Sequence, residues 1–324
     1  MISLSLNGNL NVLNVDDAAA PRVVQAHQSS IFTMYLDKPT GTVYTGDGDG
    51  CVLATNLSSG VSTKLKSTDK KAINAQCHTN KVVGIAKIAE SGELMSIGWD
   101  DKIRFADMAS GAYTAVDVGL ASQPVACANS RTGSLVAVIT LQEIAVYRGR
   151  DKVASLSGLG YSPKSVAICN DEEVAVGDDK ADAGKTYIYK IDGASLVKVT
   201  EIPTRSQVTS LAYNSIGDLL AIGDAGRQVE VYERGTWEAR IKNKWVFHTS
   251  RVQALAWSPS GNFLASGALD ESIFVWNLAK PMSKLQIPFA HNAGVTGLDW
   301  VAEDRIVSVG ADRVVAQWAV PAEF

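Results

Sequence analysis

The chain has 324 residues, of which 46% are hydrophobic and 20% are charged, a balance typical of globular proteins. Its formal net charge of −4 provides no global basic field, which argues against binding to nucleic acid or to an anionic membrane. No apolar run approaches the ~20 residues that a membrane-spanning helix needs.

Predicted strands begin at the first residues and continue to the end of the chain, as short β-branched or aromatic runs with a period of two. Residues 1–20 hold the runs ISLSL and NLNVLNV, and residues 22–26 hold RVVQA. Seven similar units follow, each with an apolar strand, a turn, a strand of small residues, a tight turn and a third strand. In chain order they are IFTMY/TVYTG/CVLAT, VVGIA/ELMSIG/KIRFA, PVACA/LVAVI/EIAVY, SVAIC/EVAVG/TYIY, VTSLAY/LLAIG/QVEVY, VQALAW/FLASG/SIFVW and VTGLDW/RIVSVG/VVAQW.

The repeat length predicts the fold. After a longer first interval, the third strands end at markers about 41–44 residues apart, which are Thr55, Ala106, Tyr147, Tyr189, Tyr232, Trp276 and Trp318. Such a period with several strands per unit is typical of four-stranded propeller blades. We therefore predict an all-β, seven-bladed β-propeller with four antiparallel strands per blade over residues 21–324. Because open strand edges invite aggregation, residues 22–26 should pair with residues 314–320 and close the ring.

A polar pattern recurs within the last two units. His248, Ser266, Asp270 and Trp276 keep nearly the same spacing as a second set, His291, Ser308, Asp312 and Trp318. Two partial copies occur earlier and lack the tryptophan, His27/Thr45/Asp49 and His78/Ser96/Asp100. These sets include all four histidines. We expect the aspartate to accept from the histidine ring, the histidine to bond to the hydroxyl, and the indole N–H to donate to that hydroxyl.

Ser266, His248 and Asp270 also have the composition of a hydrolytic triad. The same trio recurs in other units, however, and an active site has no need to repeat, so we interpret these residues as structural. No other polar constellation suggests catalysis, and we expect no enzyme activity. The four cysteines are widely spaced without a CxxC pair, so we expect free thiols, no metal site and no cofactor.

The tetrads are a mark of WD repeats, and the chain resembles the actin-interacting protein 1 family of WD-repeat proteins. The resemblance rests on KWVFHTSRVQALAWSPSGNFLASGALDESIFVWNLAKP, IVSVGADRVVAQWAV, MSIGWDDKIRFADM, and SQPVACANS followed by LVAVITLQEIAVY. It implies two tandem seven-bladed propellers that assist cofilin in disassembling actin filaments, with this chain matching the second propeller alone. Residues 1–20 would then be remnant strands of a preceding repeat, and the main actin-contacting surface would lie in the absent first propeller.

A candidate partner-binding patch lies around Trp99. This residue falls in the turn between second and third strands, with Asp101 close by, and Lys70 and Lys71 should enter from the same side. A large exposed aromatic flanked by charges is a plausible protein contact. The alternatives are that Trp99 lies against its own blade and that the lysines belong to a solvated edge strand.

The predicted partners are actin filaments and cofilin, bound by a cytoplasmic monomer at the actin cytoskeleton. The alternative function is a WD-repeat scaffold for other proteins.

Overall fold

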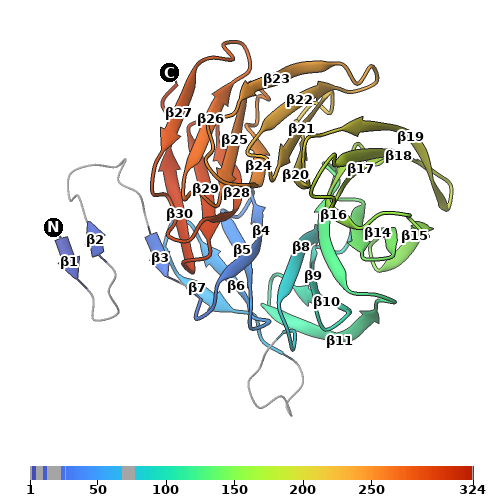
Figure 1. Cartoon of the computed structure of the whole chain (residues 1–324). Helices are drawn as coiled ribbons and strands as arrows, with labels where there is room; N and C mark the ends of the chain where they lie inside the picture. Colours follow the sequence, from blue (N-terminus) through green and yellow to red (C-terminus); the bar gives the residue numbers. More distant parts are fainter. Residues whose placement is uncertain (1, 5–9, 13–22, 26, 68–76, 323) are drawn as a thin grey trace.

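The computed structural model describes residues 2–4, 10–12, 23–25, 27–67, 77–322 and 324, and every regular element in these ranges is a β-strand. Strands β3 to β30 form seven blades of four strands each, arranged in a ring (Figure 1). Blades 3 and 4 are joined into one sheet at their outer edges by the parallel pairing of Ser155 with Ser195. The first strands of neighbouring blades contact each other all the way around, with β28 of the last blade meeting β4 of the first. The seven-bladed, all-β propeller predicted from the repeat is confirmed. Because these ranges contain no helix, they contain none that could cross a membrane.

The blades follow the chain in order. Blade 1 contains β4 (Ile31–Asp37), β5 (Thr42–Asp47), β6 (Val52–Asn56) and β7 (Ser62–Lys64). Blade 2 contains β8 (Val82–Ile88), β9 (Glu93–Gly98), β10 (Lys102–Asp107) and β11 (Ala112–Gly119). Blade 3 contains β12 (Pro124–Asn129), β13 (Val136–Thr140), β14 (Glu143–Arg148) and β15 (Asp151–Ser157). Blade 4 contains β16 (Pro163–Cys169), β17 (Glu173–Asp178), β18 (Lys185–Asp192) and β19 (Ser195–Pro203).

The remaining blades repeat this order. Blade 5 contains β20 (Val208–Tyr213), β21 (Leu219–Asp224), β22 (Val229–Glu233) and β23 (Ala239–Trp245). Blade 6 contains β24 (Val252–Trp257), β25 (Phe263–Ala268), β26 (Ile273–Asn277) and β27 (Lys284–Ile287). Blade 7 contains β28 (Val295–Ala302), β29 (Arg305–Gly310) and β30 (Val314–Ala319), and its fourth strand is β3 (Val23–Gln25).

The ends of the propeller are joined as predicted. Val23, Val24 and Gln25 pair antiparallel with Ala316, Val315 and Val314. The N-terminal strand therefore supplies the outer edge that blade 7 lacks, which confirms the expected pairing for the described residues, 23–25 with 314–316. Ahead of it, β1 (Ile2–Leu4) and β2 (Leu10–Val12) form a separate two-stranded antiparallel sheet. The rest of residues 1–20, assigned above to a preceding repeat, lies outside the described residues.

The core lies between the blades, and the sequence pattern follows from it. Second strands carry small residues because the next blade packs tightly against them. A Cβ at Gly267, for example, would lie 2.4 Å from Val295 of blade 7. The aromatic residues that end first strands bond across blades, since the indole of Trp300 donates to the Ala256 carbonyl at 3.0 Å. Trp257 donates in the same way to the carbonyl of Ala212, so blades 5, 6 and 7 are joined near the axis.

Candidate functional site

Blades 6 and 7 each contain a complete hydrogen-bonded tetrad. In blade 6, His248 Nδ1 lies 2.9 Å from the Asp270 carboxylate and Nε2 lies 2.8 Å from Ser266 Oγ. Trp276 Nε1 donates to the same hydroxyl at 2.8 Å. Since a carboxylate only accepts and an indole only donates, the protons run one way, from the indole to the hydroxyl, from the hydroxyl to Nε2, and from Nδ1 to the carboxylate.

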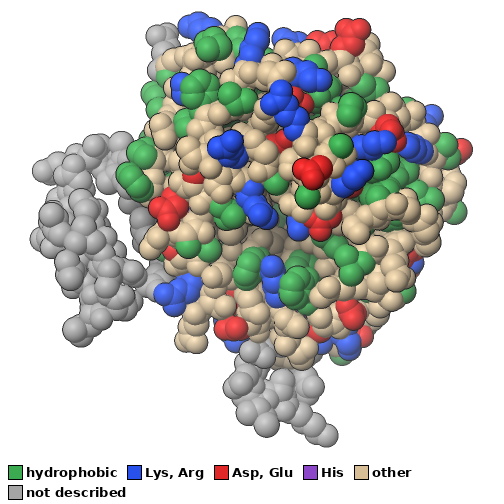
Figure 2. Space-filling model, viewed as in Figure 1, with side chains coloured by type: hydrophobic (Ala, Val, Ile, Leu, Met, Phe, Trp, Pro, Cys, Tyr) green, Lys and Arg blue, Asp and Glu red, His purple; other side chains and the backbone are tan. Residues whose placement is uncertain are grey.

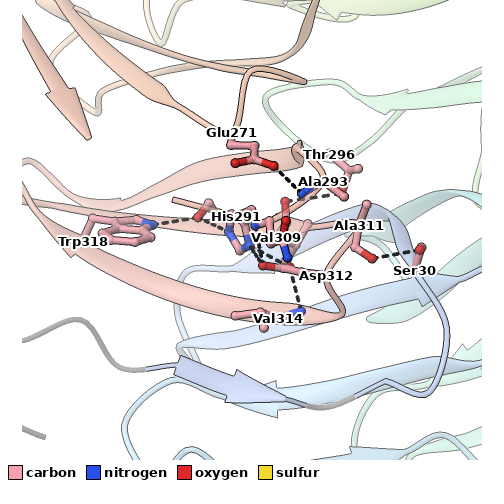
Figure 3. A network of polar contacts seen from close by, with 12 residues as sticks. Ser30, Glu271, His291, Ala293, Thr296, Val309, Ala311, Asp312, Val314 and Trp318 are labelled. Atoms are coloured by element: carbon pink, nitrogen blue, oxygen red, sulfur yellow. Dashed lines mark hydrogen bonds and ion pairs between the residues drawn. The ribbon is translucent and has the colours of Figure 1, made fainter. Parts of the chain in front are cut away.

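Blade 7 repeats this arrangement (Figure 3). His291 Nδ1 lies 3.0 Å from Asp312, Nε2 lies 2.7 Å from Ser308 Oγ, and Trp318 donates to Ser308 at 2.7 Å. Neighbouring blades join this network. The Ala293 N–H donates to Glu271 of blade 6 at 3.0 Å, and Ser30 of blade 1 donates to the Ala311 carbonyl at 2.8 Å. The tetrad therefore holds the turns of three blades in one arrangement.

Blade 2 completes its partial set with a residue that the sequence pattern missed. His78 lies 2.7 Å from Asp100 and 2.8 Å from Ser96 Oγ. Ala106 replaces the tryptophan, and the hydroxyl of Tyr113, on the fourth strand, lies 3.0 Å from Ser96 Oγ in its place. The available signal in the sequence was a tyrosine on the strand that follows the one that carries tryptophan in blades 6 and 7.

In blade 1 the prediction that Asp49 is the acidic partner of His27 was wrong. His27 Nε2 lies 2.6 Å from Thr45 Oγ1 as expected, but Nδ1 lies 2.8 Å from Asp47 and not from Asp49. Asp47 is buried, whereas Asp49 is exposed. The reason is the residue at the end of the second strand. In blade 2 this position is Gly98, where a Cβ would lie 2.4 Å from the ring of His78, so the acid must come from the following turn. In blade 1 it is Asp47, whose carboxylate reaches the ring directly.

Two of the tetrad acids, Asp270 and Asp100, have a lowered pKa that favours the ionised form. Burial acts to raise the pKa of Asp270, but hydrogen bonds from His248 and Ser272 outweigh it and hold the pKa well below its usual range. The pKa of Asp100 is lowered in the same way, with burial opposed by His78 and by the Thr79 backbone. These are the properties of structural hydrogen-bonded pairs, in which an ionised carboxylate accepts from the histidine ring.

The geometry excludes a hydrolytic triad at these positions. The three tetrad serines, Ser96, Ser266 and Ser308, are fully buried at 0% exposure. In blades 6 and 7 the serine Oγ also accepts an indole N–H, so no substrate atom has access to it. A nucleophile needs both access and a position for the reacting carbon near its oxygen.

The turns that carry the tetrads form one face of the propeller, which we call the tetrad face. It consists of the loops that precede the first strands and the turns between second and third strands. Trp99 lies on it, 40% exposed, and its backbone N–H donates to the Lys81 carbonyl at 2.8 Å. The Lys81 ammonium lies 4.8 Å from the centre of the Trp99 ring and 3.5 Å from that of Phe32, which is 39% exposed. Trp99, Lys81 and Phe32 thus form an aromatic–lysine cluster.

The electrostatics of this cluster are mixed. Burial, followed by the charge of Lys164 in blade 4, lowers the pKa of Lys81. Asp101 is exposed and has a φ of 57°, a conformation shared by Glu271 and Arg313 in the same turns of other blades. The turn therefore fixes the backbone conformation at this position, and the position accepts different side chains. Lys70 and Lys71 lie outside the described residues. Across the one side of the molecule that it displays, Figure 2 shows basic, acidic and hydrophobic side chains interspersed.

A cavity of about 770 Å³ lies where the first strands end, on the face of the propeller opposite the tetrad face. Four of the charged side chains that line it form ion pairs, since Lys87 donates to Asp37 at 2.7 Å and Lys38 lies 3.5 Å from Asp299. The four cysteines are free thiols. Within the described part of the chain, no three His, Cys, Asp or Glu side chains gather closely enough to bind a metal.

Comparisons with known proteins identify the repeat and its relatives. Residues 241–277 match the family described as "WD domain, G-beta repeat". The chain is 32% identical to actin-interacting protein 1 of Drosophila melanogaster, 30% to actin-interacting protein 1 of Caenorhabditis elegans, and 28% to the 66 kDa stress protein of Physarum polycephalum. Each similarity covers 99% of this chain and 51% of the relative, so the chain spans about half the length of these curated relatives. The protein is therefore a β-propeller that contains a WD repeat and is similar, over nearly its whole length, to about half of each of these relatives.

Proposed function

We propose that this WD-repeat propeller binds actin filaments together with cofilin and contributes to cofilin-assisted filament disassembly, as the second of two propellers. The observation that carries the proposal is similarity over 99% of the chain to proteins named actin-interacting protein 1. The proposed role is one of binding without catalysis, by a monomer in the cytoplasm at the actin cytoskeleton, because the apparent triads are buried structural pairs.

The tetrad face is the proposed contact surface, with Trp99 and Asp101 as contacts. Trp99 and Phe32 are exposed but held in place by Lys81. An aromatic side chain that is already ordered loses little conformational entropy on binding, which favours a role as an anchor. Lys70 and Lys71 remain proposed contacts from the sequence alone.

The second candidate function is a scaffold for partners other than actin, and cosedimentation with filaments separates the two. We expect the chain to pellet with actin filaments more strongly when cofilin is present. Trp99→Ala should weaken this binding about tenfold or more, because loss of a buried aromatic anchor costs ~2 kcal/mol.

The matched control is Ile216→Ala. Ile216 is 62% exposed and lies between β20 and β21, at the opposite end of the strands. This variant should bind as the wild type does. Equal binding by the wild type and Trp99→Ala, at equal stability, would rule out the Trp99 contact. Failure of the wild type to pellet with filaments under either condition would favour the scaffold function.

A further inference from the structure

Blade 5 lacks the histidine that four other blades place between themselves and the preceding blade. His27, His78, His248 and His291 each lie four residues before the first paired residue of their blade. The corresponding residue before Val208 in blade 5 is Thr204, whose hydroxyl donates to the nearby Ser206 carbonyl at 2.9 Å. No imidazole therefore occupies this position beside blade 5.

Blade 5 nevertheless keeps the acid that such a histidine would contact. Asp224 pairs with Val208 as Asp47 pairs with Ile31 in blade 1, and both aspartates follow a glycine. Both are buried, at 4% and 2% exposure. Asp47 bonds to His27, whereas Asp224 accepts the Gln228 backbone N–H at 2.8 Å and has no ring beside it. Burial, with a contribution from the charge of Glu230, raises the pKa of Asp224.

Polar side chains of blades 4 and 5 are turned toward the same interface on this side of blade 5. Gln228 lies opposite Asp224, and Glu230 is two residues further along the same strand, so their side chains share one face of the blade. That face is turned toward blade 4, because a Cβ at Gly177 would lie 2.4 Å from the side chain of Val208. Thr186 pairs with Gly177, so its side chain is turned toward the same interface.

Two of these oxygens have no partner. Thr186 Oγ1 and Gln228 Oε1 are buried without a hydrogen bond, in residues that are 0% and 7% exposed. Glu230 is 7% exposed and accepts the Tyr232 hydroxyl through Oε2 at 2.7 Å. Burial raises the pKa of Asp224 despite the opposing charge of Arg205, which is exposed in the adjoining loop. The interface is therefore rich in buried acceptor oxygens.

We propose that a calcium-type cation binds between blades 4 and 5, held by the carboxylates of Asp224 and Glu230, Gln228 Oε1 and Thr186 Oγ1. Carboxylate, amide and hydroxyl oxygens are the ligands that hard cations take. Calcium suits the site better than magnesium because it accepts irregular oxygen shells, whereas magnesium retains several of its waters. The cation would take the place of the imidazole N–H that contacts the corresponding aspartate, Asp47, in blade 1.

Calcium binding and thermal unfolding of the full chain test the proposal directly. After treatment with EDTA and desalting, the chain should bind one equivalent of calcium in equilibrium dialysis. CaCl2 should raise its melting temperature by several degrees, EDTA should reverse the shift, and MgCl2 should produce a smaller one. Absence of bound calcium, together with equal melting temperatures in all three solutions, would overturn the proposal and leave buried water as the partner of the orphaned oxygens.

Variants locate the site. Asp224→Asn and Glu230→Gln should each abolish the calcium-dependent shift, whereas Asp182→Asn, which changes an exposed acid in the neighbouring turn, should retain it. Thr204→His should place an imidazole beside Asp224, as His27 lies beside Asp47. It should therefore raise the melting temperature in EDTA and remove the response to calcium. A calcium shift that persists in Glu230→Gln and Thr204→His would place any calcium site elsewhere and contradict the proposal, even if Asp224→Asn does not fold.

Discussion

Asp47 and Asp49 belong to one turn, but only Asp47 supports the blade. Asp47 bonds to His27 and accepts the backbone N–H groups of Asp49 and Cys51 at 3.0 and 2.8 Å. The Asp49 side chain is exposed. Buried groups left without a partner cost about 1–3 kcal/mol each, whereas exposed substitutions change stability little.

We therefore predict that Asp47→Ala lowers the free energy of unfolding by about 2–4 kcal/mol and that Asp49→Ala changes it by less than about 0.5 kcal/mol. Asp270→Ala in blade 6 should behave like Asp47→Ala. Urea or thermal unfolding of the three variants measures the differences. A larger loss for Asp49→Ala than for Asp47→Ala would contradict the assignment made here.

Asp270 should also make the free energy of unfolding depend on pH in the acidic range. Burial acts to raise its pKa, but hydrogen bonds from His248 and Ser272 outweigh it and lower the pKa below the value of about 3.9 expected in the unfolded chain. For a depressed folded pKa, the stabilisation is present above about pH 4 and is lost as the pH falls toward the folded value. The stability difference between the wild type and Asp270→Asn should thus narrow from about pH 6 to about pH 3. Urea titrations check this, and a difference that widens in acid would refute it.

At the scale of the element, the strands and the closing pair follow from local sequence. Alternation of apolar residues, small residues in second strands and the spacing of the third strands were sufficient to predict seven blades and the pairing of β3 with β30. The partners of individual polar side chains were less predictable. Spacing alone selected Asp49, because only the packed structure shows that Asp47 faces the ring of His27. The Tyr113 hydroxyl replaces a tryptophan from a different strand, which a linear pattern does not contain.

The closing strand provides a prediction at this scale. Removal of residues 1–26 would leave the edge of β30 without its partner β3, so we expect a lower melting temperature and a tendency to aggregate. Removal of residues 1–20 keeps β3 and should leave the melting temperature unchanged if those residues form no part of the propeller. Differential scanning calorimetry and light scattering distinguish the two truncated chains. Equal behaviour of both truncations would show that β3 does not stabilise the ring.

At the scale of the whole molecule, the tetrads form a repeated structural framework, whereas the exposed side chains of the tetrad face differ between blades. The tetrads hold turns of neighbouring blades together (Figure 3), and such turns present Trp99 and Asp101 to solvent, with Phe32 exposed at the start of β4. The repeat identified the frame, whereas the contact between Lys81 and Phe32 depends on packing between blades 1 and 2. Partner specificity should therefore lie in the side chains that differ between blades.

The chain spans about half the length of its relatives, so we propose that it carries one of two filament-binding sites in a protein of that full length. Linking two modest sites can raise the apparent affinity by ~10²–10⁴ without new contacts. We therefore expect this propeller to bind cofilin-decorated filaments weakly and to disassemble them poorly by itself. Fluorescence microscopy of filaments with cofilin, comparing this chain with the two-fold longer Drosophila melanogaster relative at equal concentration, measures the deficit. Disassembly at the potency of the longer protein would contradict the proposal that this propeller alone is insufficient for full activity.

The most direct test of the central claim is cosedimentation of the wild-type chain with actin filaments, with and without cofilin. The proposed function predicts that the chain pellets with filaments and that cofilin increases the bound fraction. A chain that stays in the supernatant under both conditions, at concentrations well above those of the filament sites, would contradict an actin-binding role for this propeller.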